Sequence, residues 1–182
     1  SNAGSGHPGA FLSKPVDDRL NVVQLNVTAP VEMAHRFGQR LIDRGRGAII
    51  FTGSTSAFSG VPMLANYAAT KAFIGTFAEG LHAEWSPSGV DVLVVHPGPT
   101  RTEMVEQDGV DFDRVPVSWM TPDQVAAKAL GSVGRKAVLV PGVPNKIQRF
   151  VFTRLLSRRA AARIFGGLMR RVTDDEQVVG AT

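Results

Sequence analysis

Tyr67 and Lys71 form the pair of residues whose types and spacing best fit a chemical role. Tyr67 is the only tyrosine in the chain, and both residues belong to the stretch NYAATKAFIGTFAEGLHAEW. The apolar spacing of this stretch predicts a helix over residues 66–85, on which residues four apart share a face. A nearby ammonium favours the phenolate and brings the tyrosine pKa down from about 10, as general acid–base catalysis requires. The same spacing also fits a tyrosine that packs at a helix surface beside a solvent-exposed lysine.

Ser54 stands thirteen residues before Tyr67, just after the apolar run Ala48 to Thr52. This run predicts a buried strand that ends at a glycine. A hydroxyl at the carboxyl end of a parallel strand points into the crevice where open α/β sheets bind ligands. Ser54 can there donate a hydrogen bond to a carbonyl oxygen.

A second predicted strand, VDVLVVHPGP, ends at the same edge of the sheet. Pro97 and Gly98 turn the backbone sharply past a ligand site, and Thr102 adds a hydroxyl a few residues later. Each of these features alone is also compatible with a plain turn or cap, so their weight lies in the combination.

Together, these stretches resemble the short-chain dehydrogenase/reductase family over residues from about Ser1 to Gly142. STSAFSGVPMLANYAATKAF resembles the family's serine-to-Tyr-x-x-x-Lys segment, and VLVVHPGPTRT resembles its Pro-Gly-x-x-x-Thr segment. NVVQLNVTAP resembles the helix with the family's active-site asparagine, which falls on Asn26. SNAG resembles the Asn-Asn-Ala-Gly stretch that ends the family's fourth strand, with Ser1 replacing the first asparagine.

The resemblance implies a catalytic role for four residues. Tyr67 would be the general acid in carbonyl reduction and the base in alcohol oxidation, and Lys71 would lower its pKa and bind the nicotinamide ribose. Ser54 would polarise the carbonyl, and Asn26 would hold a water that continues the proton relay from Lys71. The implied substrate is a small carbonyl compound or alcohol, and the implied cofactor is NAD or NADP. The residues implied to contact the cofactor are Asn2, Ala3, Gly4, Tyr67, Lys71, Pro97, Gly98 and Thr102.

The glycine-rich turn with which this family places a pyrophosphate on a helix N-terminus has no counterpart in the sequence. About 80 residues would be expected before Ser1, at roughly 30 or more per βαβ unit. Ser1-Asn2-Ala3 is also the tripeptide that cleavage of a common tag leaves. Asn2 lies 24 residues before Asn26, a separation that suits the family and favours native sequence at the cofactor edge. We therefore expect the C-terminal two-thirds of a reductase, without its N-terminal cofactor-binding part.

The predicted elements alternate between helices and strands, which indicates an α/β fold with a parallel sheet covered on both faces. We expect a single Rossmann-like, doubly wound domain over residues 1–182, with three strands of a sheet that normally has seven. Pro30 should bend the first helix or interrupt one of its hydrogen bonds, and Gly166-Gly167 could break the last. The predicted helices cover residues 16–44, 66–85, 121–133 and 144–172, and Thr121 followed by proline is the expected N-cap of the third. The predicted strands cover residues 48–52, the stretch 90–99, which runs into a Pro-Gly break, and residues 136–142.

Composition limits the alternatives. The chain has no cysteine, and its four histidines lack metal-ligand spacing, so we predict neither disulfides nor a metal site. No apolar run reaches membrane-spanning length and no signal peptide is visible, which makes a cytoplasmic protein the default expectation. The net charge is +4, but residues 1–145 hold 12 basic against 13 acidic residues. Since the excess charge belongs to one segment, we expect no nucleic-acid binding.

Residues 146–171 hold eight basic residues and no acidic one, and they alternate with apolar residues. A basic amphipathic helix over 144–172 can lie on an anionic membrane, or it can cover the substrate pocket or a subunit interface. We expect a homodimer or homotetramer through the helices at 16–44 and 64–86. The alternative to an active reductase is a non-catalytic relative that uses the same fold as a dimerisation or binding module.

Overall fold

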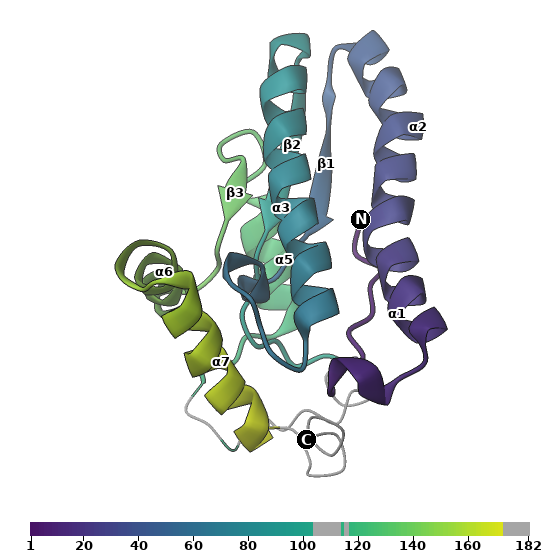
Figure 1. The fold of residues 1–182 in the computed structure, drawn as a ribbon. Coiled ribbons are helices and arrows are strands. Elements are labelled where there is room, and N and C mark those ends of the chain that lie inside the picture. Colours follow the sequence, from purple (N-terminus) through teal and green to yellow (C-terminus); the bar gives the residue numbers. More distant parts are fainter. Residues whose placement is uncertain (104–113, 115–116, 173–182) are drawn as a thin grey trace.

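A parallel sheet forms the centre of the computed structural model, which describes residues 1–103, 114 and 117–172 (Figure 1). Its strands, in spatial order, are β1 (Gly47–Thr52), β2 (Val90–Val95) and β3 (Val138–Leu139). Gly47 of β1 pairs with Val90 of β2, and the register continues to the ends of both strands. The predicted α/β class, with three parallel strands, is confirmed.

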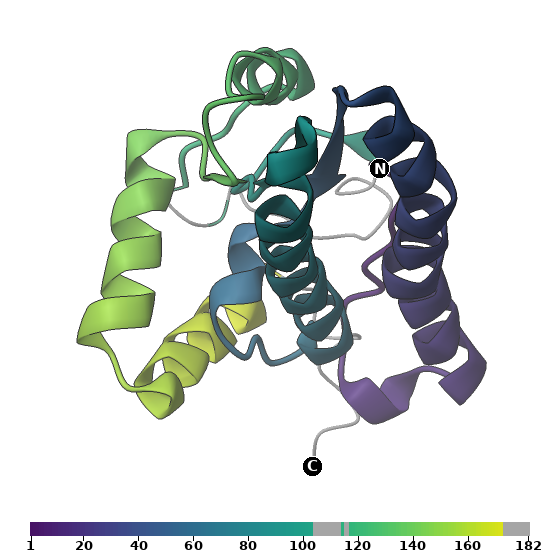
Figure 2. The same cartoon turned by 90° about the horizontal axis from the view of Figure 1, so that it is seen from above.

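Helices cover both faces of the sheet (Figures 1 and 2). On one face lie α2 (Ala29–Arg44) and α3 (Ala65–Trp85), and on the other lies α5 (Pro122–Leu130). Side chains of β2 alternate between these layers, as strand geometry requires. Val92 and Val94 pack toward α2 and α3, whereas Leu93 and Val95 pack toward α5. Both faces of β2 are therefore buried, which explains its uninterrupted apolar sequence.

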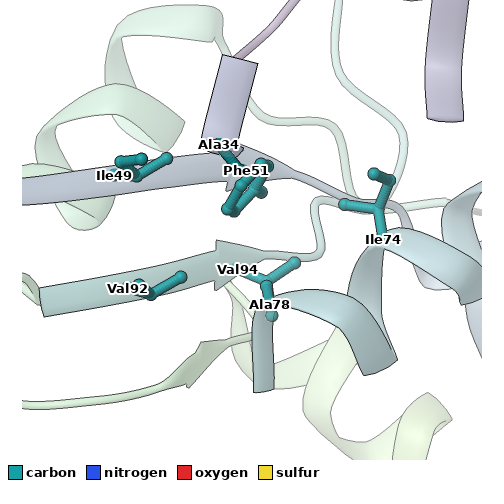
Figure 3. Packing of buried hydrophobic residues seen from close by; sticks show 7 residues of the cluster. All are labelled: Ala34, Ile49, Phe51, Ile74, Ala78, Val92 and Val94. Carbon is teal, nitrogen blue, oxygen red and sulfur yellow. The ribbon is translucent and has the colours of Figure 1, made fainter. Parts of the chain in front are cut away.

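The larger core cluster joins β1 and β2 to the two helices above them (Figure 3). Phe51 is fully buried there, and its ring meets Phe77 of α3 edge to face at 5.9 Å between centroids. The seven buried residues of this cluster are Ala34, Ile49, Phe51, Ile74, Ala78, Val92 and Val94. This packing holds α3, and with it the Tyr67–Lys71 pair, at a fixed height over the sheet.

The predicted helix over 16–44 is interrupted. It consists of α1 (Val16–Val23), a π-helical turn (Gln24–Thr28) and α2. The amide of Ala29 donates to the carbonyl of Gln24, five residues earlier. Pro30 has no amide hydrogen to give to the carbonyl of Asn26, four residues before it, and its ring crowds that carbonyl. The irregularity expected at Pro30 therefore lies in the preceding turn and surrounds Asn26.

The buried face of α1 and α2 also differs from the apolar face that the sequence suggests. The buried residues recur three or four positions apart and include polar ones: Arg19, Val22, Asn26, Pro30, Ala34 and Gly38. Leu20, Leu25 and Phe37 are exposed instead. The helix approaches Trp85 so closely at Gly38 that an added Cβ would lie 2.5 Å from its ring, so packing decides which face is inside.

The C-terminal segment forms two helices joined by a π-helical turn. α6 (Val143–Phe150) runs into the turn Val151–Leu155, and α7 (Arg158–Val172) follows. The break falls at residues 156–157, so the break predicted at Gly166-Gly167 is wrong. Gly166 instead allows α7 to lie against Pro62, which an added Cβ would approach to 3.1 Å.

Other local predictions agree with the structure. Thr121 caps α5 in a capping box with Gln124, as the sequence Thr-Pro suggested. Three short 3-10 helices complete the described elements: Phe11–Ser13, Thr55–Phe58 and Ser86–Ser88.

Among the described residues, every helix is too short or too polar to span a membrane.

Candidate active site

The predicted catalytic residues come from three different elements. Ser54 follows β1 and caps the 3-10 helix at Thr55–Phe58. Tyr67 lies in the first turn of α3, and Lys71 lies one turn later. Asn26 lies in the π-helical turn before α2. The fold thus brings an N-terminal helix junction, a strand end and the start of α3 to one place.

Lys71 is only 5% exposed, which is unusual for a lysine. Its Nζ donates a hydrogen bond to the carbonyl oxygen of Thr52 at 2.9 Å and lies 5.5 Å from the centroid of the Tyr67 ring. Burial lowers the pKa of Lys71 to about 8. The ammonium is therefore still mostly protonated at neutral pH, close to Tyr67, and poised to lose its proton.

Asn26 is almost completely buried, and both amide hydrogens of its side chain are used. Its Nδ2 donates to the carbonyl of Ser5 at 2.9 Å and to Oγ1 of Thr70 at 3.0 Å. Its Oδ1 accepts from the amide of Ser5 at 3.0 Å. The side chain thus ties the N-terminal loop to α3. It has no amide hydrogen left for a water, so the relay water predicted at Asn26 finds no donor in the side chain.

Gly4 lies between the two buried residues. A Cβ added there would be 3.1 Å from Oδ1 of Asn26 and 3.4 Å from Nζ of Lys71. These distances are shorter than most Cβ contacts in proteins, so a residue with a side chain would push the backbone away. Glycine therefore lets the backbone lie close to Lys71. Residues 1–4 thereby border the site, as the SNAG resemblance implied.

Ser1 extends the sheet beyond β1. Its amino group donates to the carbonyl of Ile50 at 2.8 Å, and its carbonyl accepts from the amide of Thr52 at 3.1 Å. This alternation is the pattern of a parallel strand pair. Asn2 and Ala3 follow directly and are exposed, on the edge of the sheet where Lys71 is bound.

The turn after β2 closes the other side of the site. The carbonyl of Pro97 accepts from the amide of Thr55 at 2.9 Å, so the turns after β1 and β2 are joined. A Cβ at Gly98 would overlap the side-chain amide of Asn145, which is why this turn needs glycine. Thr102 lies half-buried four residues beyond Gly98. The loop expected over 101–118 falls for the most part outside the described residues.

Sequence comparison assigns these features to a known family. The family model for "short chain dehydrogenase" matches residues 1–111. The chain belongs to this family. The short-chain dehydrogenase "Dehydrogenase/reductase SDR family member 7B" of Xenopus tropicalis is 32% identical over 79% of this chain and 49% of its own length. "Probable oxidoreductase EphD" of Mycobacterium tuberculosis is 28% identical over 90% of this chain and 31% of its own.

Solved structures of short-chain dehydrogenases share the fold. A short-chain dehydrogenase from Sphingobium yanoikuyae in complex with NADPH superposes with a TM-score of 0.74 at 30% identity, over 96% of this chain and 64% of that one. A 7beta-hydroxysteroid dehydrogenase structure gives a TM-score of 0.78 at 22% identity, over 90% of this chain and 64% of that one. This chain therefore spans less than two thirds of the length of these relatives.

The sequence analysis did not single out His96, which contacts Ser54 in this short-chain dehydrogenase. His96 is 2% exposed, and its Nδ1 lies 3.2 Å from the amide nitrogen and 2.9 Å from the carbonyl oxygen of Ser54. Burial lowers the pKa of His96 to about 4, so the ring is neutral at pH 7. A polar ring at the end of an apolar strand, directly before Pro97, was the available signal.

Arg19 was also missed. It is 5% exposed, and its guanidinium donates to the carbonyls of His7, Ala10 and Phe11 at 2.8, 2.8 and 3.1 Å. These bonds fold the loop of residues 5–15 against α1. The loop and the start of α3 then enclose a small pocket lined by Gly6, His7, Gly9, Phe11, Arg19, Met63, Leu64, Ala65, Asn66 and Tyr67. A charged residue among apolar helix positions gave only a weak signal for this role.

Proposed function

We propose that the protein is an NAD(P)-dependent oxidoreductase that interconverts a carbonyl compound and a secondary alcohol. The observation behind this proposal is the buried Lys71 beside the Tyr67 ring, at the edge where residues 1–4 meet Asn26. A buried ammonium that keeps most of its charge at neutral pH stabilises a phenolate next to it. That arrangement suits a tyrosine that gives and takes a proton.

The residues present fit a nicotinamide cofactor. Glycine at position 4 lets the backbone of residues 1–4 approach Nζ of Lys71, and glycine at position 98 lets the turn after β2 lie against Asn145. The residues that would hold the cofactor are Asn2, Ala3, Gly4, Tyr67, Lys71, Pro97, Gly98 and Thr102. The Sphingobium relative was solved with NADPH, and a Brucella melitensis relative was solved with NADH. Both forms of the cofactor therefore remain candidates.

When bound, the reduced nicotinamide supplies the hydride that reduces the carbonyl carbon. Tyr67 then donates its phenolic proton to the carbonyl oxygen, and Lys71 stabilises the resulting phenolate. Ser54 donates a hydrogen bond to the same oxygen, and His96 fixes the Ser54 backbone. In the reverse direction, Tyr67 removes the proton of the alcohol.

A proton relay beyond Lys71 needs a group near Asn26 that accepts a hydrogen bond from a water molecule. Because both Nδ2 hydrogens of Asn26 are used, we assign the water-holding group to its backbone carbonyl. Pro30, at the position of the usual helical donor, has no amide hydrogen for this carbonyl.

Replacement of Tyr67 by phenylalanine tests the proposal. In the whole protein, Tyr67→Phe should lower the turnover of NADPH or NADH with a panel of ketones by at least about 10²-fold. The unfolding temperature should stay close to that of the unmodified protein, because the ring that packs on the helix is kept. Glu79→Gln, at an exposed position on the same helix, is the control and should keep normal turnover. Unchanged turnover in Tyr67→Phe would show that Tyr67 is not the acid.

The alternative of a non-catalytic binding module is less favoured. Burial of Lys71 lowers its pKa and so destabilises the folded state at neutral pH. A non-catalytic module gains nothing from this loss of stability, whereas an acid–base site needs the buried ammonium next to its tyrosine.

The exposed apolar residues of α1, α2 and α3 suit a homo-oligomer. Leu20, Phe37 and Phe73 are 58%, 51% and 43% exposed, and these helices lie on the same face of the sheet. We propose that they form the interface of a homodimer or homotetramer. Sedimentation velocity of the whole protein, with Phe37→Asp as the disrupting variant, tests this proposal.

A further inference from the structure

One side of α6 presents apolar residues to solvent. Val143, Ile147 and Phe150 are 66%, 59% and 57% exposed. Their spacing of four and three residues places them on one face of the helix. The opposite face holds Asn145, which is 5% exposed and donates to the carbonyl of Pro141 at 2.8 Å. α6 therefore has a polar residue inside and an apolar stripe outside, the reverse of an ordinary surface helix.

The neighbouring helix α7 shows the usual arrangement. Its Phe165 and Met169 are buried against Val61 and Ala68 of the loop and helix that carry Tyr67. The predicted role of the C-terminal segment as a cover for the substrate pocket stays a prediction, and the packing of α7 agrees with it. It does not account for the apolar stripe of α6.

Exposed basic residues adjoin this stripe in the sequence. Lys146 and Arg154 are exposed, and Arg149 lies over the Phe58 ring at 5.2 Å. Between residues 124 and 173 the sequence has 11 basic residues and no acidic one. Within the described part of that range, none of these basic side chains forms a salt bridge. The charge is therefore available to an external anion.

We propose that the α6 outer face, defined as Val143, Lys146, Ile147, Phe150 and Arg154, binds the surface of an anionic phospholipid membrane. The three apolar side chains enter the boundary between headgroups and acyl chains, while the basic side chains contact the phosphates. The helix would lie parallel to the membrane surface, and the protein would not cross the membrane.

The position of α6 supports this partner over a second copy of the chain. α6 lies on the opposite side of the molecule from α1 and α2, so both surfaces can be used together (Figures 1 and 2). Pairing of two α6 outer faces would bring their like charges together, which opposes association. An anionic lipid surface instead complements both the charge and the apolar stripe.

The helix that carries the α6 outer face also lies next to the candidate site. Asn145 points inward from the same helix and contacts the backbone of Gly98. A membrane on the outer face would thus lie about one helix diameter, ~10 Å, from the turn after β2.

Vesicle sedimentation of the whole protein tests the proposal. Vesicles of phosphatidylcholine with phosphatidylglycerol should bind the protein at low salt, and vesicles of phosphatidylcholine alone should bind it much less. Binding should fall strongly at ~0.5 M NaCl, where surface charges are screened. The double variant Ile147→Ser/Phe150→Ser should bind anionic vesicles at least about tenfold more weakly.

Two control variants isolate the surface. Leu130→Ser removes an equally exposed leucine from α5, and Arg40→Glu reverses an exposed charge on α2. Leu130→Ser should bind vesicles like the unmodified protein, and Arg40→Glu should lose less binding than the matched reversal Arg154→Glu. Equal losses in Arg40→Glu and Arg154→Glu would show non-specific charge attraction and contradict the proposal.

Three further outcomes would overturn it. The first is an absence of binding to anionic vesicles at low salt. The second is a lower sedimentation coefficient of the double variant than of the unmodified protein, while the unmodified protein does not bind vesicles. This result would assign the α6 outer face to a second copy of the chain. The third is binding that appears only after removal of residues 173–182, whose Asp174, Asp175 and Glu176 would then cover the face in the intact chain. None of these readouts depends on the proposed activity.

Discussion

The cluster around Asn26 and the outer face of α6 use helices in opposite ways. Asn26 is buried in a helical turn and held by three hydrogen bonds, and Lys71 beside it is held by one to Thr52. On α6, apolar side chains face solvent, and the apolar residues of α7 next to it face inward. A buried polar group is costly unless it is paired, so its position is strictly fixed by its partners. An exposed apolar group has no such constraint and shows where an external partner can bind.

Lys71 should give the largest effect. Lys71→Met keeps most of the side-chain volume but removes the charge beside Tyr67. We expect turnover of the whole protein to fall by at least about 10²-fold in steady-state assays. Lys14→Met, at an exposed position, is the control. Normal turnover in Lys71→Met would place the acid–base chemistry elsewhere.

The same variant should change the pH dependence of stability. Because the pKa of Lys71 is lowered from 10.5 to about 8, the unfolded chain binds more protons than the folded one between these values. The free energy of unfolding should therefore rise with pH across this window, by up to about 3 kcal/mol. Lys71→Met should lack this rise in urea titrations of the cofactor-free protein. An identical pH profile in both proteins would contradict the burial of the ammonium.

Asn26→Leu tests how strongly the polar cluster fixes the N-terminal loop. It leaves the amide and carbonyl of Ser5 and the hydroxyl of Thr70 without their partner. At about 1–3 kcal/mol for each of these three unpaired groups, we expect a loss of at least about 3 kcal/mol in chemical denaturation. Asn21→Leu, at an exposed position of α1, should change stability by less than about 0.5 kcal/mol. Equal effects of the two substitutions would show that the cluster contributes no stability of its own.

His96 should make the protein sensitive to acid. Its pKa is lowered from 6.5 to about 4, mainly by burial, so below pH 6.5 the unfolded chain takes up a proton that the folded chain does not. Stability should fall as pH falls from 6.5 to 4, by up to about 3 kcal/mol. His96→Asn should remove this part of the acid sensitivity, because an amide does not titrate, while it can still reach the Ser54 backbone. A similar acid profile in His96→Asn would exclude His96 as the cause.

The sequence predicted the elements whose signals are local. The strand before Ser54, the helix with Tyr67 and Lys71, and the Thr121 cap each depend on neighbouring residues, and the structure has all of them. Pro30 also predicted an irregular helix, because the missing amide hydrogen is a property of proline itself. The irregular turn lies one turn before Pro30, because the hydrogen bond that proline cannot make would have ended at the carbonyl of Asn26.

What could not be predicted depends on contacts between distant segments. Leu20 and Arg19 are adjacent on α1, and hydropathy favours the leucine for the core, yet Arg19 is buried because three loop carbonyls bind it. His96 approaches Ser54 only because β1 and β2 pair. In the same way, nothing within α6 indicates that Asn145 should face inward, because its neighbour is Gly98 of another segment.

A pair of identical substitutions separates the two sides of the C-terminal segment and should include the smallest effect. Phe165→Ala on α7 removes a ring that is 8% exposed and should cost about 3 kcal/mol of stability. Phe150→Ala on α6 removes a ring that is 57% exposed and should cost less than about 0.5 kcal/mol. Thermal and urea unfolding of both variants measure the difference. If Phe150→Ala destabilises the isolated protein as much as Phe165→Ala, the α6 stripe belongs to the core, and its apolar residues are not free to meet a membrane.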